Sequence, residues 1–148
     1  MLKKWDEDLT SVPIAKPPKY DVSYSYDGVL VMSARAREVI VAAGMSGMEF
    51  RPLQAGLFSA RPSVVVAFDA AARETRFEKP CPVCGTYEEV AGATPVFLKP
   101  GAVVPDNGFA RTDLEFGSGD EKMPLVLCGD QAAQVLKSKR LKGLRLTR

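Results

Sequence analysis

The chain has 148 residues, a formal net charge of +2 and 46% hydrophobic residues. These values fit one globular domain and exclude disordered, collagen-like and coiled-coil chains. The sequence has no histidine, which excludes the Ser-His-Asp triad, the Cys-His pair and every His-ligated metal site. We therefore expect a protein that is not an enzyme.

Residues 1–20 are expected to form an extended N-terminal arm. Pro13, Pro17 and Pro18 fix φ and remove amide donors, which favours extended backbone. Trp5 is the only tryptophan, and we expect it to hold this arm against the body as a surface strap; a peptide ligand for an aromatic groove is the alternative.

No membrane partner is expected, because no apolar run approaches the roughly 20 residues of a membrane span. The two lysines near the start precede no apolar stretch, so the segment does not have the form of a secretory signal. Three cysteines cannot make a closed disulfide set. These features favour a cytoplasmic protein.

The first ordered elements are expected from about Asp21 onward. The sequence predicts a strand up to Gly28, a second strand over 29–32, a helix over 34–43 and a third strand over 48–53. Ser33 has the hydroxyl of a helix N-cap, and Gly44 is a helix stop. Residues 54–62, with Gly56 and Pro62, are expected to be a loop.

The middle of the chain predicts several short elements. We expect a buried strand over 63–68, a turn or short helical piece over 69–74 and strands over 75–79, 87–90, 95–98 and 112–116. Tight or turn-rich segments separate them at 81–85, 100–110 and 117–122.

The last part of the chain repeats the pattern of the first. A strand over 124–129, a helix over 130–139 and a strand over 143–147 are expected, and residues 29–51 align with 125–147 without a gap at an offset of 96. The predicted fold class is α+β: a two-layer body of mixed or antiparallel sheet with two strand–helix–strand repeats, forming a single domain over 21–148. Each helix places one apolar stripe in the core. The predicted core residues are Val39, Ile40, Val135 and Leu136.

The sharpest local motif is CPVCG at residues 81–85. Cys81 and Cys84 have the spacing with which two thiolates bind one zinc ion in a zinc knuckle, but a structural zinc site needs four ligands. Three interpretations stay open. The motif is a vestigial turn without metal and the chain has no cofactor; it is half of a zinc site completed by a second copy in a homodimer or by Glu88 and Glu89; or it is a redox pair. Cys128 is expected to be a small buried apolar residue.

A run of cations near the C-terminus is the second candidate. The run contains Lys137, Lys139, Arg140 and Lys142, and no acidic residue follows Asp130 in the sequence. Such a run of positive charge suits an acidic partner. A solvated face with cations favourably placed at a helix C-terminus is the alternative. Nucleic acid is not the expected partner, because no aromatic side chain lies among these cations to stack on bases.

Three segments together resemble a known family. Residues 28–53, the CPVCG motif and residues 123–148 are similar to the double-CXXCG motif family of bacterial proteins, and in style to immunity proteins of bacterial polymorphic toxin systems. The resemblance implies a cytoplasmic immunity-type protein that binds and blocks a cognate toxin. The family pattern has two CXXCG motifs, and this chain has one. The alternative function is a small metal-knuckle adaptor or regulator, with nucleic acid as a contact.

Overall fold

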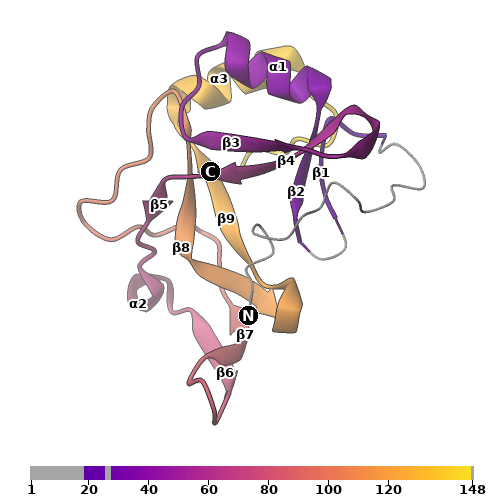
Figure 1. Ribbon diagram of the computed structural model, residues 1–148. Coiled ribbons are helices and arrows are strands. Elements are labelled where there is room, and N and C mark those ends of the chain that lie inside the picture. The colour runs from indigo at the N-terminus through magenta and orange to yellow at the C-terminus, as the bar shows by residue number, and fades with distance from the viewer. Residues whose placement is uncertain (1–18, 26–27, 148) are drawn as a thin grey trace.

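The computed structural model describes residues 19–25 and 28–147 (Figure 1). Residues 1–18, which include most of the expected N-terminal arm, lie outside the described residues. The fold is α+β, as predicted, with two sheets of antiparallel and mixed strands and two main helices, α1 (Ala34–Ala42) and α3 (Asp130–Lys139).

The first sheet is antiparallel, with the order β1-β2-β4-β3. Its strands are β1 (Val22–Tyr24), β2 (Leu30–Ser33), β3 (Met48–Pro52) and β4 (Leu57–Pro62). Helix α1 begins where predicted, because the Ser33 hydroxyl accepts a hydrogen bond from the amide of Ala36 at 3.1 Å. It ends before Gly44, whose φ of +66° is in the left-handed region that a glycine adopts without strain.

Strand β4 corrects the prediction of a loop over 54–62. Only Gln54–Gly56 forms a connection, a short 3-10 helix called η2, and the next six residues pair with β2 on one side and β3 on the other. Ser59 and Ala60 are almost fully buried in this strand. Gly56 and Pro62 stand at its two ends, where a turn glycine and a proline are compatible with strand pairing.

The second sheet is mixed and is built around the long strand β8 (Phe109–Ser118). The strand order is β5-β8-β7-β6, with β9 (Met123–Cys128) paired to β8. The other members are β5 (Val65–Val66), which is parallel to β8, and the hairpin strands β6 (Arg76–Pro80) and β7 (Tyr87–Ala91). The short helix α2 (Ala70–Arg73) and a 3-10 turn, η3 (Gly119–Glu121), complete the described elements.

Two strands predicted in the middle region are wrong in extent. The predicted strand over 63–68 is reduced to Val65–Val66, and the predicted strand over 95–98 is a single bridge between Leu98 and Phe68. Backbone bonds explain the difference: the Phe97 carbonyl accepts from the amide of Asp69, and the Ala67 carbonyl accepts from the amide of Lys99. These two segments contact each other locally instead of adding strands to the sheet.

The internal repeat extends further than predicted, because the strand before each repeat is equivalent as well. In the β1–β2 pair, Val22 lies opposite Met32. In the β8–β9 pair, Phe109 lies opposite Cys128, the residue that aligns with Met32 at the offset of 96. The amide of Ser33 donates to the Asp21 carbonyl at 2.8 Å, and its equivalent, the amide of Gly129, donates to the Gly108 carbonyl at 3.0 Å. The two halves therefore have the same hairpin register and the same entry into a helix.

The two halves also exchange equivalent contacts across the molecule. After α1, the Ser46 carbonyl accepts from the amide of Phe109 in β8; after α3, the Lys142 carbonyl accepts from the amide of Val22 in β1. A glycine follows each of these residues, with φ of +79° at Gly47 and +84° at Gly143. A Cβ at Gly47 would lie 2.5 Å from the Phe109 carbonyl oxygen, and one at Gly143 would lie 2.3 Å from that of Val22. Each half thus closes on the first strand of the other.

One hydrophobic core lies between these two halves. Ile40 and Leu136, equivalent residues of α1 and α3, are 2% and 3% exposed and belong to the same cluster. The prediction that Val39 and Val135 are core residues is only partly right, because both are half-buried. A second, smaller core under β7 and β8 contains Phe68, Val90 and Phe116.

The predicted strand over 143–147 is wrong. This segment pairs with no strand within the described part of the chain. Leu144 and Leu146 nevertheless pack against the main core, as do their equivalents Met48 and Phe50 in β3. The difference has a physical reason: β3 is held by β4, and no described strand takes the place of β4 in the second half. None of the helices in the described ranges is long and apolar enough to span a membrane.

Candidate binding site

The basic face consists of Lys137, Lys139, Arg140 and Lys142, at the C-terminal end of α3. All four residues are exposed, and none of their side chains forms an ion pair with another described residue. Lys137 and Lys139 occupy the last turn of α3, where positive charge also stabilises the end of the helix. The four cations that the sequence singled out thus lie exposed at one end of α3, with Lys137 and Lys139 on different sides of the helix.

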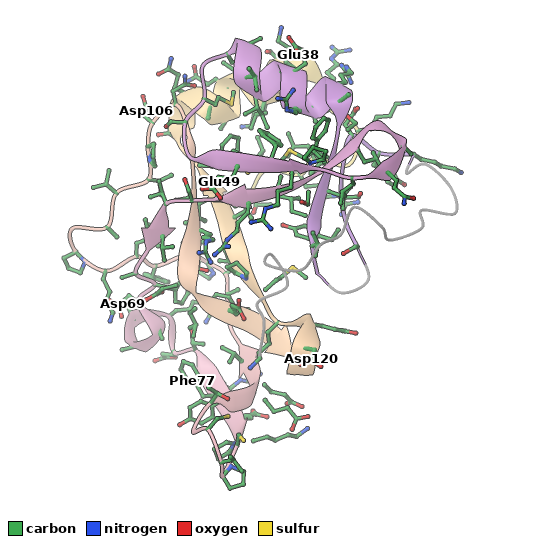
Figure 2. All side chains as sticks on the ribbon, in the orientation of Figure 1. Glu38, Glu49, Asp69, Phe77, Asp106 and Asp120 are labelled. Atoms are coloured by element: carbon green, nitrogen blue, oxygen red, sulfur yellow. The ribbon has the colours of Figure 1, made fainter. Side chains whose placement is uncertain are left out.

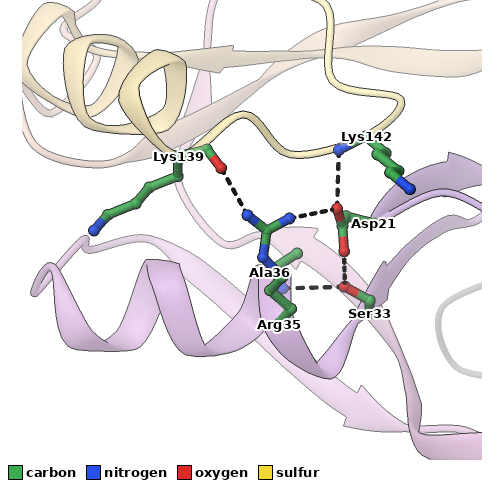
Figure 3. Close-up of polar contacts among 6 residues, drawn as sticks. All are labelled: Asp21, Ser33, Arg35, Ala36, Lys139 and Lys142. Atoms are coloured by element: carbon green, nitrogen blue, oxygen red, sulfur yellow. Dashed lines mark hydrogen bonds and ion pairs between the residues drawn. The ribbon is translucent and has the colours of Figure 1, made fainter.

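A half-buried carboxylate, that of Asp21, fixes the backbone beneath this face (Figure 3). Asp21 accepts hydrogen bonds from the Ser33 hydroxyl at 2.8 Å, from the Lys142 amide at 2.9 Å and from the Arg35 guanidinium at 3.0 Å. Arg35 also donates to the Lys139 carbonyl at 2.8 Å, which joins α1 to the end of α3. Burial by itself raises the pKa of Asp21, but these hydrogen bonds and the charge of Arg35 outweigh it and lower the pKa.

A groove adjoins the basic face along the outer edge of β9. Its volume is about 380 Å³. It is lined by the residues of β9 from Leu125 to Cys128, by one face of α3 and by the segment 145–147, together with Thr94 and Val96. Lys137 and Arg145 bring positive charge to the groove, and Asp130 brings one negative charge.

The CPVCG motif forms the tip of the β6–β7 hairpin, as the predicted tight turn. The amide of Gly85 donates to the Cys81 carbonyl at 3.0 Å, and the amide of Cys81 donates to the Thr86 carbonyl at 2.6 Å. Val83 is 93% exposed between the two cysteines. The hairpin extends from the end of the molecule opposite to α1 and α3, as the labels Phe77 and Glu38 in Figure 2 show.

The two thiols of this hairpin differ in environment. Both are free, with Cys81 half-buried and Cys84 exposed. The Sγ atom of Cys84 lies 2.9 Å from the Thr86 hydroxyl. Hydrogen bonds from Thr86, first through its side chain and then through its backbone, and a further one from Cys81 lower the pKa of Cys84 to about 7. Cys84 is therefore largely a thiolate just above neutral pH.

The donor set at the hairpin does not fit a complete zinc site in one chain. A structural zinc ion needs four ligands, and the described residues contain no group of three or more cysteine, aspartate or glutamate side chains placed to hold a metal. Of the carboxylates considered with the knuckle, Glu89 forms an ion pair with Lys79. Cys128 is distant in the fold, in β9 beside α3, where it is half-buried against the main core and burial raises its pKa.

Comparisons with known proteins identify no relative: the chain matches no protein-family model, no curated protein and no solved structure.

Sequence reasoning found the basic face and the hairpin thiols but not the groove. The groove depends on an outer edge of β9 with which no other described strand pairs, as the sheet topology shows. The repeat alignment contained the needed signal, because Arg145 and Leu146 align with Glu49 and Phe50. With residues 57–62 predicted as a strand, the alignment would have indicated a strand in the first half that no described strand matches in the second.

Proposed function

We propose that this chain is a non-catalytic binding protein of the immunity type, which acts in the cytoplasm by binding a cognate protein toxin and blocking it. The observation that carries the proposal is the basic face. Four exposed cations stand on a backbone that the Asp21 network holds in place. Such a preformed charged surface favours association with an acidic partner surface.

The chemistry of the side chains supports binding rather than turnover. The sequence has no histidine, and the most acidified nucleophile, Cys84, is held by a threonine hydroxyl and a second cysteine. A hydroxyl and a thiol are poor general bases at neutral pH. The thiolate of Cys84 also favours the second candidate, a metal-knuckle adaptor, but Cys81 and Cys84 together supply only half of the four ligands of a structural zinc site.

The test is the rate of association between this chain and the product of the neighbouring gene. Lys137→Glu and Arg140→Glu are expected to slow association about tenfold at low salt and to flatten its salt dependence, because rim charges act mainly on the encounter step. The matched control is Arg76→Glu on β6, an exposed cation at the other end of the molecule.

Unchanged association in both basic-face variants would remove that face from the interface. Complete failure to bind, with zinc or nucleic acid purified in its place, would contradict the proposal and favour the metal-knuckle adaptor.

A further inference from the structure

We infer that the groove beside β9 is a docking site for one extended, acidic segment of the partner protein, which adds a strand between β9 and residues 145–147. The inference rests on the proposed function and names the contact through which the partner would be held. It starts from the comparison of the two halves of the molecule.

The groove lies where the first half has β4. Strand β4 pairs with Val31 and Met32 of β2 on one side and with the β3 residues 49–51 on the other. At the offset of 96 these positions become Leu127 and Cys128 on one side and residues 145–147 on the other. All five of these equivalent residues line the groove, whereas the equivalents of the flanking partners Ser33 and Met48 do not. The second half thus has both neighbours of a central strand, and no described strand lies between them.

The edge of β9 that borders the groove has backbone groups ready to pair. The amide of Gly129 donates to the Gly108 carbonyl on β8, so in this antiparallel pair the next residue directed to β8 is Leu127. The N–H and C=O groups of Val126 and Cys128 therefore point away from β8, toward the groove. No hydrogen bond to either amide is found among the described residues. An incoming extended chain would pair with these groups by β-strand addition.

The lining side chains specify the residues of the incoming segment. In β4, Phe58 packs edge-on against Phe50 at 6.3 Å between ring centroids and lies beneath Arg37 of α1. In the groove, Leu146 is the equivalent of Phe50, and the small residue Ala133 is the equivalent of Arg37. The groove thus has room for one large apolar side chain directed toward α3.

Charge distinguishes the expected segment from β4 itself. Arg61 of β4 lies opposite Glu49 of β3. The equivalent of Glu49 is Arg145, which lines the groove with Lys137. Opposite charges stabilise a cross-strand pair and like charges destabilise it. An acidic residue is therefore expected where β4 has arginine.

The first arm of the test asks whether the groove accepts a strand. A copy of residues 53–62 is appended after Arg148, with the copy of Arg61 changed to glutamate. This extension is expected to slow amide hydrogen exchange of Val126 and Cys128 at least ~100-fold, as strand pairing does. In the matched control the copies of Phe58 and Ala60 are proline. These are the positions whose backbone would pair with Cys128 and Val126, so the control is expected to leave the amide exchange of those two residues unchanged.

The second arm asks whether the partner uses the same groove. Binding of the neighbouring gene's product to the unextended chain is expected to slow exchange of the same two amides. The extended chain is expected to lose partner affinity at least ~10-fold through occupation of the groove, since its linked strand competes as an intramolecular ligand. The proline control is expected to keep the affinity.

Several results would overturn the inference. If the extension does not slow amide hydrogen exchange of Val126 and Cys128, the groove does not accept a strand. Equal partner affinity for the extended and unextended chains means that the partner binds elsewhere, and the proposed function then stands without the groove. Slow exchange already in the isolated chain, relieved by deleting residues 2–18 or by dilution, assigns the groove to the chain's own N-terminus or to a second copy. Failure of the partner to bind even the unextended chain refutes the proposed function, and the partner assignment with it.

Discussion

At the scale of single residues, the hairpin thiols show how a short-range contact sets chemistry that the CXXC spacing alone does not. A redox-active CXXC motif usually owes its acidity to a helix N-terminus, and here the cysteines lie between two strands. The acidity of Cys84 comes from Thr86, two residues along the chain. The sequence contains this threonine, but its effect depends on a turn geometry that only the structure reveals.

The prediction at this scale concerns the reactivity of Cys84. Because its pKa is lowered to about 7, thiolate is already abundant at neutral pH. The alkylation rate at Cys84 should rise with pH through about 7 and level off above it. Thr86→Val should move this midpoint upward toward the value of an ordinary thiol, because it removes the largest stabilising hydrogen bond. Mass spectrometry of iodoacetamide-treated protein, with the extent of alkylation determined separately for each cysteine, measures the pH profile of Cys84 and its shift in the variant.

Cys128 is the internal control for that measurement. Burial raises its pKa, so its alkylation should stay slow over the same range and should not respond to Thr86→Val. If the pH midpoint for alkylation of Cys84 is near that of an ordinary thiol and Thr86→Val leaves it unchanged, then Thr86 does not lower the pKa of Cys84.

At the scale of elements, local signals predicted local structure and failed where pairing is distant. Ser33 and Gly44 mark the ends of α1, and the second helix was predicted over the residues that form α3, because caps and apolar spacing act within one turn. Strand β4 forms a local hairpin with β3, but Gly56 and Pro62 indicated a loop there, and its other partner, β2, lies far back along the chain. The pattern of residues 143–147 overpredicted a strand that has no neighbour in the described structure.

The prediction at this scale concerns the two crossing points. Gly47→Ala and Gly143→Ala would each combine left-handed backbone with a Cβ pressed onto a backbone carbonyl oxygen. The expected loss of stability is roughly 2–5 kcal/mol for each, the sum of the left-handed cost and overpacking. Urea unfolding of the purified variants measures it.

Gly44→Ala is the matched control, because Gly44 has a similar positive φ and open space where its Cβ would lie. Its expected cost is only the left-handed strain, roughly 1–2 kcal/mol. If all three substitutions cost the same, the close approach between the two halves is not what these glycines permit.

At the scale of the whole molecule, the chain contains two similar halves around its main core, and β4 of the first half has no counterpart among the described strands of the second. Gly47 and Gly143, Ile40 and Leu136, and the registers of the two hairpins show the likeness. The difference is that β4 fills the edge of β2, whereas the edge of β9 borders a groove. Lys137 belongs to the basic face and also lines the groove, so the two candidate surfaces meet at this residue. The repeat could be predicted from aligned residues, but the asymmetry was not predicted, because residues 54–62 were expected to be a loop and not a strand paired with β2.

The most direct measurement of this central asymmetry is amide hydrogen exchange at the equivalent residues Met32 and Cys128 in the isolated chain. Met32 lies opposite Phe58 of β4, so its amide should exchange slowly, with the stability of the first sheet. The amide of Cys128 points toward the groove and should exchange orders of magnitude faster, as unpaired edge amides do. Comparable protection of the two amides would contradict the account, because both halves would then have a strand at this edge.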